Sequence, residues 1–439
     1  MRAFYVVAFG QFISIVGTTM TQFGLGIWSW KFVTEIQPVA DPATAIALVA
    51  FFNLAPEVLL GPITGALVDR WNRKMVMILA DLAAGLATIA IFMLYASGEL
   101  QMWHLYVAGA WTGAFKSFQW PAFSAAISTM IPKEQYTRAN AILGLTESLS
   151  GVMAPPLAGL LLAGIGLVGI MAIDIVTFIA AVGGVLLVAI PQPPQSEAGR
   201  SGQGSLWKES LYGFRYIWGR PSLFGLQLVF FGGNLLLSLA LTLLNPMILS
   251  RTGNNELHLS WVLTSFGVGA VAGGFLLAAW GGPKRKIHGV LLGWFVTSLT
   301  TAIMGLSPSL IVWLVMGFVG SVWNVFINSS NQAIWQAKVA PDVQGRVFSA
   351  RRLIAQVIGP LGVLLAGPLA DRVFEPAMME GGSLSGALGW LVGTGPGAGM
   401  GLLFGICGGL AAIVGLSGYL FPAVRNVETL LPDHDAEGK

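Results

Sequence analysis

Four of the charged residues that lie inside long apolar stretches of the chain could carry protons or pair with one another. Lys116 interrupts the apolar run 102–130, and three acids, Glu57, Glu147 and Asp174, interrupt others. A cation at the centre of a membrane helix costs about 2.5–3.5 kcal/mol to insert, so Lys116 needs an acidic partner or an anionic ligand. Burial disfavours the charged form of a carboxyl group, which allows proton exchange near neutral pH. The residues therefore predict proton coupling through one of the acids, or a static ion pair between an acid and Lys116.

Amide and hydroxyl side chains recur at helical spacing in the runs 4–30, 102–130, 222–250 and 309–337. In a bilayer, such polar stripes turn toward protein or water. We therefore expect them to line a common cavity and to bind substrate. Some of them would serve only as hydrogen bonds between helices, each worth about 0.6 kcal/mol. The candidate substrate-binding residues are Gln11, Thr18, Thr112, Lys116, Gln119, Gln227, Asn234, Asn324, Asn328 and Asn331.

The elements that must position these side chains are membrane helices. The chain has 439 residues, of which 55% are hydrophobic and 10% charged, whereas soluble proteins carry about 25% charged residues. A crossing helix needs about 20 apolar residues. This predicts an all-α membrane protein with twelve transmembrane helices, at 4–30, 43–68, 75–96, 102–130, 139–164, 167–190, 222–250, 258–281, 287–306, 309–337, 349–373 and 398–422.

The orientation in the membrane follows from the basic residues. If both termini are cytoplasmic, most of the 23 Lys and Arg residues fall on the inside, as the positive-inside rule requires. Lys31, Arg251 and Arg372 lie outside, and Lys116 lies within a span. We interpret the apolar run after Arg2 as a first membrane helix and not as a signal peptide.

The chain divides into two bundles of six helices, residues 1–190 and 222–424, followed by a tail at 425–439. Between the bundles, the linker 191–221 begins with a Pro-rich stretch and ends in a segment whose large apolar residues recur at helical spacing: Trp207, Leu211, Phe214 and Trp218. That pattern predicts an amphipathic helix in the membrane interface. The alternative is a spacer without surface contact.

The two bundles carry traces of a duplication. Three residues of the first bundle recur in the second at a constant offset: Arg138, Gly151 and Gly159 match Arg346, Gly359 and Gly367. A shared offset favours a repeated six-helix unit.

A polar turn separates the second predicted helix from the third. It reads Gly65-Ala66-Leu67-Val68-Asp69-Arg70-Trp71-Asn72-Arg73-Lys74. This stretch resembles the loop between helices 2 and 3 of the major facilitator superfamily, whose pattern is Gly-x-x-x-Asp-Arg-x-Gly-Arg-Lys. Asn72 stands where that pattern has its second glycine, and Asn tolerates the left-handed turn conformation. We therefore expect a left-handed residue there.

The resemblance implies two six-helix bundles with a substrate site between them near the midplane. It also implies that the acidic residue of this loop holds the cytoplasmic ends of the bundles together in one state of the transport cycle. The implied gating residues are Gly65, Asp69, Arg70, Arg73, Lys74, Arg351 and Arg352.

Further stretches are similar to the bacterial branch of the superfamily that holds macrolide and enterobactin-type siderophore exporters. They are the polar turn itself, Gln344-Gly345-Arg346-Val347, and Gly367 through Pro376. The surroundings of Glu147 also resemble, in degenerate form, the helix 5 motif of the antiporters. The resemblance implies proton-coupled efflux of an amphipathic small molecule from the bacterial cytoplasm, by a monomer in the inner membrane.

Other functions remain open from the sequence. An importer or facilitator of a polar nutrient would use the same fold, and so would a non-transporting membrane partner. An enzyme is not expected, because the chain has no phosphate-binding loop and no specific nucleophile–base set. The four His residues and one Cys offer no metal-ligand spacing, so neither a metal nor another cofactor is expected. The cations are spread over short loops, which gives no reason to expect a nucleic-acid partner.

Overall fold

The computed structural model describes residues 2–130, 136–188, 213–339 and 344–432. Within these ranges it leaves out the side chains of residues 2–3, 62–63, 65–70, 73, 120–130, 136–148, 278, 344–346 and 349. All secondary structure in the described part of the chain is helical. The all-α class predicted from the apolar runs is confirmed.

Ten helical segments of the described chain are long and apolar enough to cross a membrane. One of them, Leu149–Leu187, has 39 residues and contains Gly166 at φ 65°, a non-helical residue between the predicted spans 139–164 and 167–190. The helix Met102–Met130 adds another segment of 29 residues. Counting the broken segment as two, the helices are consistent with the twelve predicted crossings.

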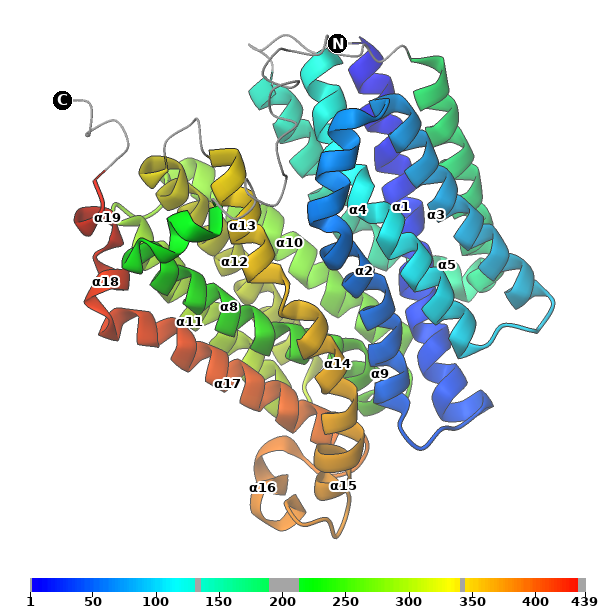
Figure 1. Ribbon diagram of the computed structural model, residues 1–439. Helices are drawn as coiled ribbons and strands as arrows, with labels where there is room; N and C mark the ends of the chain where they lie inside the picture. Colours follow the sequence, from blue (N-terminus) through cyan, green and yellow to red (C-terminus); the bar gives the residue numbers. More distant parts are fainter. Residues whose placement is uncertain (1, 131–135, 189–212, 340–343, 433–439) are drawn as a thin grey trace. The chain divides into compact units, whose positions relative to one another are not determined.

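The chain folds into two compact units. Unit 1 comprises Met1–Ser201 with Asn254–Thr264, and unit 2 comprises Gly202–Gly253 with Ser265–Lys439. The helices of unit 1, blue to blue-green in Figure 1, are α1 (Arg2–Lys31), η1 (Phe32–Ile36), α2 (Pro42–Arg70), α3 (Arg73–Ala96), α4 (Met102–Met130) and α5 (Tyr136–Leu187). Residues 254–264 include the beginning of α10 (Glu256–Trp280).

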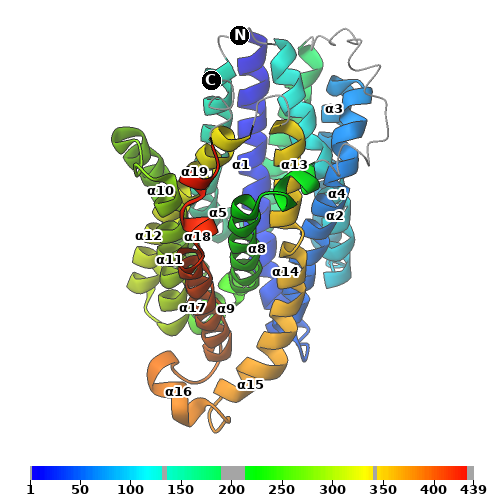
Figure 2. The same cartoon turned by 60° about the vertical axis from the view of Figure 1, so that its left-hand side comes forward.

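Unit 2 contains more and shorter helices, because two of its predicted spans are interrupted (Figure 2). Its helices are α8 (Pro221–Thr242), α9 (Leu244–Arg251), the rest of α10, α11 (Lys286–Leu306), α12 (Leu310–Lys338), α13 (Gln344–Gln356), α14 (Gly359–Leu369), η3 (Ala370–Phe374), α15 (Glu375–Met378), α16 (Ser385–Val392), α17 (Ala398–Leu420), α18 (Pro422–Arg425) and α19 (Val427–Leu430).

Glycines set how closely the helices of unit 1 approach one another. A Cβ at Gly113 of α4 would lie 2.0 Å from the backbone oxygen of Asn53 in α2. A Cβ at Gly17 of α1 would lie 2.5 Å from Oγ1 of Thr177 in α5. Small residues of this kind let helix backbones pack closely in membranes, where no hydrophobic effect drives them together.

The core of unit 2 gathers around a buried tryptophan. The ring of Trp294 fills the space that a Cβ would need at Gly233, and its Cβ and backbone fill that space at Gly415, so α11 packs closely against α8 and α17. The short helix at 213–218 joins the same core through Ile217, which is 1% exposed. The first half of the predicted interfacial helix of the linker lies outside the described residues, and Trp218 at its end is 67% exposed.

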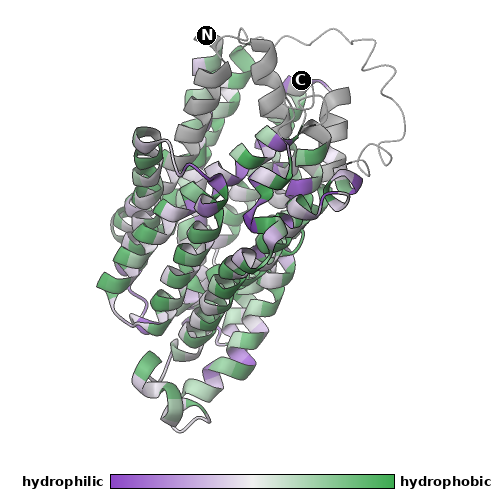
Figure 3. Ribbon diagram, turned by 90° about the vertical axis from the view of Figure 1, so that its left-hand side faces the viewer, coloured by the Kyte–Doolittle hydropathy of each residue, from purple (hydrophilic) through white to green (hydrophobic). Residues whose placement is uncertain are grey.

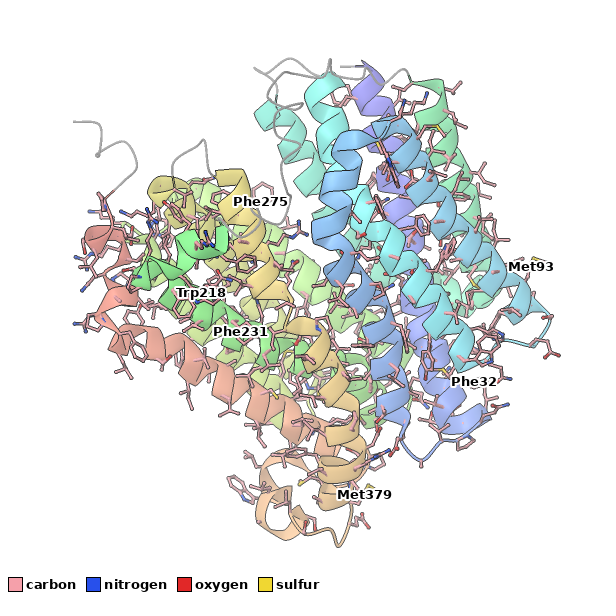
Figure 4. All side chains as sticks on the ribbon, viewed as in Figure 1. Phe32, Met93, Trp218, Phe231, Phe275 and Met379 are labelled. Carbon is pink, nitrogen blue, oxygen red and sulfur yellow. The ribbon has the colours of Figure 1, made fainter. Side chains whose placement is uncertain are left out.

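The surfaces of both units carry many large apolar side chains, as expected where lipid is the solvent. Figure 3 shows long hydrophobic stretches along the helices. Phe275 (labelled in Figure 4) is 73% exposed, and Ile311 is 72% exposed. In water, an apolar surface of this extent would cause aggregation.

Candidate functional site

Asp81 is the centre of a buried hydrogen-bonded group in unit 1. Its side chain comes from α3 and is 7% exposed. Oδ2 accepts a hydrogen bond from Nε2 of Gln11 in α1 at 2.8 Å, and Oδ1 accepts one from Nε2 of Gln119 in α4 at 2.9 Å. Three helices therefore meet at one carboxyl group, and both of its oxygens are bound by neutral amides.

Asp174 of α5 is the centre of a second group. It is 2% exposed and accepts hydrogen bonds from the hydroxyls of Thr18 in α1 at 3.0 Å and Thr88 in α3 at 3.5 Å. The second of these is long, so the first contributes more. Gly17 makes the approach possible, because a Cβ there would lie 3.1 Å from Oδ1 of Asp174.

The two groups lie along the same helix faces. Gln11 and Thr18 are seven residues apart on α1, and Asp81 and Thr88 are seven apart on α3. Seven residues make two helical turns, or about 10 Å. The two carboxyl groups, each bound by side chains of α1 and α3 or held on α3 itself, are therefore about two turns apart along these helices.

Neither carboxyl group has a cationic partner in the part of the chain that the structure describes. The two ion pairs found there are Lys31–Glu256 and Lys116–Glu57. An ionised carboxylate is expensive to bury without an opposite charge, and neutral donors offset only part of that cost. Protonation removes the cost, so both positions are chemically suited to take up and release a proton.

Lys116 pairs with Glu57, at 3.0 Å between Nζ and Oε2. Glycines at 109 and 113 bring α4 against α2 at this level, and Nδ2 of Asn53 donates to Oγ1 of Thr112 at 3.2 Å. The Lys116 side chain is 54% exposed. Because an exposed ammonium is costly against acyl chains, we expect this side of α4 to face water.

The polar residues of α8 in unit 2 bind the backbone. Nε2 of Gln227 donates to the carbonyl oxygen of Arg351 at 3.0 Å, and Nδ2 of Asn234 donates to that of Ala355 at 2.9 Å. The second carbonyl belongs to the last turn of α13, just before the helix breaks. These two amides, predicted to bind substrate, are used in the structure to hold a broken helix.

The polar residues of α12 divide between the core and the surface. Asn331 is buried and accepts a hydrogen bond from Nε1 of Trp335 at 3.0 Å. Asn324 and Asn328 are exposed, and Nδ2 of Asn328 donates to Oδ1 of Asn324 at 2.9 Å. The exposed pair is available to a ligand, whereas Asn331 is occupied.

The predicted gating residues are only partly described. The side chains of Gly65, Asp69, Arg70 and Arg73 lie outside the described residues. Lys74 donates to the carbonyl oxygens of Leu186 and Val188 at 2.9 and 2.8 Å. Arg351 donates to Oε1 of Gln332 at 3.0 Å, and Arg352 to Oε1 of Gln356 at 3.2 Å. Glu147, one of the candidate proton carriers, also has an undescribed side chain.

The left-handed conformation expected at Asn72 is wrong. Its φ and ψ are −67° and 112°, and its side chain accepts from the backbone N–H of Met75 at the start of α3. Asn is among the preferred N-cap residues, so it replaces the glycine of the motif by capping the helix rather than by adopting positive φ.

Asp81 is the residue that the sequence analysis missed. The signal was present, because a lone acid in the apolar run 75–96 needs partners, and Thr88 follows it by two helical turns on the same face. The partners come from two other helices, however, and the sequence does not show which helices are neighbours.

Curated relatives of this chain are exporters. Macrolide efflux protein A of Streptococcus pyogenes is 27% identical over 380 residues, which cover 84% of this chain and 90% of that protein. Enterobactin exporter EntS of Escherichia coli is 27% identical over 316 residues, which cover 71% of this chain and 72% of that protein.

Solved structures share the fold at lower identity. A bacterial homolog of the human lysosomal transporter Spinster, inward-facing and unoccupied, has a TM-score of 0.65 at 15% identity and covers 95% of this chain and 97% of its own. A POT family transporter in complex with 5-aminolevulinic acid has a TM-score of 0.70 at 11% identity, covering 96% of both chains. The family model described as Major Facilitator Superfamily matches residues 4–363. The chain belongs to the Major Facilitator Superfamily of membrane transporters.

Proposed function

We propose that the protein is a secondary active transporter that exports an amphipathic small molecule in exchange for protons, by alternating access. The observation that carries the proton part is Asp174, which is 2% exposed, hydrogen-bonded to threonine hydroxyls and without a cation in the described part of the chain. A carboxyl group in that setting gains from protonation and can lose the proton when water or substrate reaches it.

Asp81 supports the same proposal from a second position. Its two amide donors hold the carboxyl group at the interface of α1, α3 and α4. Glu57 has a different role, because it is already paired with Lys116. An anionic substrate group could displace Glu57 from Lys116, which would free that carboxyl group to accept a proton. We therefore assign proton binding to Asp174 and Asp81, and substrate sensing to the Lys116–Glu57 pair.

An amphipathic substrate suits the mixture of groups on α4. Trp111 is 47% exposed and lies 4.8 Å from the ring of Phe115, one turn before Lys116. Aromatic faces beside a few polar or charged groups are typical of small-molecule sites. The relatives' names add macrolides and enterobactin, two large molecules with both apolar and polar parts.

We place the protein in the bacterial cytoplasmic membrane as a monomer with both termini inside. The asymmetry of Lys and Arg between the loops of the two sides supports that orientation. Protons and the exported molecule are its expected partners, with the bilayer as its solvent.

The test is transport by the purified full-length protein in sealed vesicles. A macrolide and a catecholate siderophore are offered separately, with and without an imposed pH gradient. We expect substrate-dependent proton movement, detected by a trapped pH-sensitive dye, and gradient-driven accumulation of at least one probe. Vesicles without protein and vesicles with a protonophore are the controls. Equal accumulation of a probe with and without the pH gradient would overturn the proposed proton coupling.

A second candidate is uptake of a polar nutrient. It is favoured by the exposed Asn324–Asn328 pair on α12, because amides suit a hydroxylated solute. Labelled sugar or nucleoside entering vesicles without a pH gradient would support uptake. Failure of both probe classes to move would leave a non-transporting role.

A further inference from the structure

The segment that joins the last two membrane spans is unusually poor in charge. It runs from the end of the span Ala350–Met378 to the beginning of α17 at Ala398. Glu380 is the one charged residue between them, and 381–397 has none. A Gly-rich connection of this kind has little reason to fold unless it is packed against something. It nevertheless forms α16.

Two partly buried charged residues from neighbouring elements, Arg251 and Glu375, hold this segment in place. The Glu375 carboxylate accepts from the backbone N–H groups of Gly397 and Met400. Nε of Arg251 donates to the carbonyl oxygen of Gly397 at 3.1 Å, and Nη2 donates to that of Val392 at 3.2 Å. The two charged groups thus bind backbone polar groups of the segment and of the start of α17.

The same arginine ties the segment to the end of α11. Its Nη1 donates to the carbonyl oxygens of Gly305 and Ser307 at 3.1 and 3.0 Å. On the inner face of α16, Val392 is 1% exposed and packs in a small core with Met378 and Leu402. The segment is therefore a built, rigid element and not a loose loop.

The outer face of α16 is apolar. Trp390 is 81% exposed and Leu391 is 38% exposed, and they share the face with Gly386 and Ala387, which are also exposed. Positions 386, 387, 390 and 391 lie on one side of a helix. Nε1 of Trp390 donates to the carbonyl oxygen of Ala387 at 2.9 Å, so the indole's one donor is satisfied within the helix.

We propose that α16 lies along the membrane surface and inserts this face, with Trp390 as its anchor, into the boundary between lipid headgroups and acyl chains. Its neighbours on both sides of the chain are membrane spans, so it cannot lie far from the bilayer. Figures 1 and 2 show it beside α15 and the start of α17. Tryptophan is enriched at this boundary, and a helix with one apolar face and no need to cross lies in its plane.

Lipid fits this face better than a second copy of the chain does. The apolar surface continues onto Met379, which is 42% exposed at the same end of unit 2 (Figure 4), and onto Val373, which is 52% exposed within the preceding span. It is thus continuous with the lipid-facing surface of the helices. A face of four residues is far smaller than the roughly 1,200–2,000 Å² that a stable protein interface buries.

As a consequence, this end of unit 2 is held at a fixed depth in the membrane. Because Arg251 and Glu375 connect α16 to α9, α11 and α17, anchoring α16 in lipid also anchors those helix ends. The broken helix α13–α14 then has one end held at the bilayer surface, and its motion is confined to the other end.

The test uses the full chain in lipid vesicles with a single reporter thiol. Cys407 is the only cysteine, and Cys407→Ala gives a thiol-free background. Trp390→Cys and, as the matched control, Ser383→Cys are then labelled with an environment-sensitive dye. Both positions are exposed and lie in the same connection. Lipids brominated along the acyl chain and aqueous iodide serve as the two quenchers.

We expect the label at 390 to be quenched several-fold more strongly by the brominated lipid than the label at 383, with the reverse order for iodide. Equal quenching of both labels by iodide would overturn the proposal. The proposal would also be overturned if protection of the label at 390 from iodide disappeared when the protein is diluted in excess lipid, because a second copy of the chain would then be covering this face. If the labelled variants fold poorly, intrinsic tryptophan fluorescence decides the same question. Quenching by brominated lipid should then be weaker in Trp390→Phe than in the wild type.

Discussion

The two units use the same types of polar side chain for different purposes. In unit 1, the amides of Gln11 and Gln119 and the hydroxyl of Thr18 donate to carboxyl groups. In unit 2, the amides of Gln227 and Asn234 donate to backbone carbonyl oxygens. A stripe of Gln, Asn and Thr along a membrane helix therefore does not by itself identify a substrate cavity.

The difference matters because a carboxyl group can change its charge and a carbonyl group cannot. In the function that we propose, unit 1 responds to protons through Asp81 and Asp174. The amides of α8 in unit 2 instead bind carbonyl oxygens of α13, and that of Asn234 binds Ala355 in the last turn before the break at Gly359 and Pro360. The proposed function thus places proton response in unit 1 and mechanical support in unit 2.

Each unit contains a close crossing of two corresponding helices, but the glycine that allows it lies on a different helix in each unit. In unit 1, Gly113 on α4 lets the backbone of α2 approach. In unit 2, Gly269 on α10 lets α12 approach, since a Cβ there would lie 2.3 Å from the carbonyl oxygen of Phe318. α10 and α12 occupy the places in the second half that α2 and α4 occupy in the first. The corresponding helices therefore cross closely in both halves, although the glycine lies on the fourth helix of the first half and on the second helix of the other.

The largest effect is expected from Asp174→Asn. Asparagine has the same shape and can still accept from Thr18, but it cannot release a proton. We expect gradient-driven transport to fall to the level of protein-free vesicles, while exchange of labelled for unlabelled substrate persists. Transport in sealed vesicles measures the first and counterflow the second. The matched change in unit 2 is Asn331→Ala, which should leave the dependence on the pH gradient intact. Gradient-driven transport by Asp174→Asn at the wild-type rate would remove the distinction between the units.

A smaller effect is expected from Gly113→Ala. The added methyl group would collide with the backbone of Asn53, and overpacking of this kind costs about 1–3 kcal/mol. Thermal unfolding in detergent should show a lowered midpoint, and the Lys116–Glu57 pair should be disturbed because α2 and α4 separate. Gly61→Ala on α2 is the control, because nothing lies within 4 Å of a Cβ there. An unchanged midpoint for Gly113→Ala would show that the crossing tolerates a wider spacing.

Much of the fold could be predicted from the sequence, because lipid imposes simple rules on length and apolarity. The interruption at Gly166 lies where the sequence analysis separated two spans. Prolines were a poor guide, however. Pro155 and Pro156 lie inside α5 without ending it, whereas the predicted span 349–373 breaks just before Gly359 and Pro360. Whether neighbouring side chains satisfy the freed backbone groups decides between a continuous helix and a break, and a sequence does not show those neighbours.

The candidate site was harder to predict for the same reason. The sequence offered Glu57, Glu147 and Asp174 as partners for Lys116, and the choice of Glu57 depends on the packing of α2 against α4. Asp81 received no role because its two donors come from different helices. α16 was not expected at all, because its short Gly-rich sequence is held by Glu375 just before it and by Arg251, which is distant in the chain.

A still smaller effect is expected from removing a hydrogen bond by which α8 supports the end of α13. Asn234→Ala removes the donor to the carbonyl oxygen of Ala355 at the end of α13. Leaving that group without a partner should cost about 1 kcal/mol of unfolding free energy, measured by denaturation in detergent. Ser238→Ala, one turn later, removes a hydrogen bond to its own helix and should cost less. The pH dependence of transport should not change in either variant. A shifted pH profile in Asn234→Ala would mean that unit 2 also takes part in proton coupling.

The smallest effect on stability is expected from Asn328→Ala. This variant tests whether the exposed amides of α12 bind substrate. Asn328 is exposed, and within the described part of the chain its side chain donates to Asn324 of its own helix. The unfolding free energy should therefore stay within about 0.5 kcal/mol of the wild type. If the exposed amides contact substrate, the half-saturating substrate concentration should rise several-fold with the maximal rate unchanged, because only binding is lost. Initial rates over a range of substrate concentrations measure both quantities. An unchanged half-saturating concentration would confine the polar residues of α12 to structural roles, and substrate recognition would then have to come from unit 1.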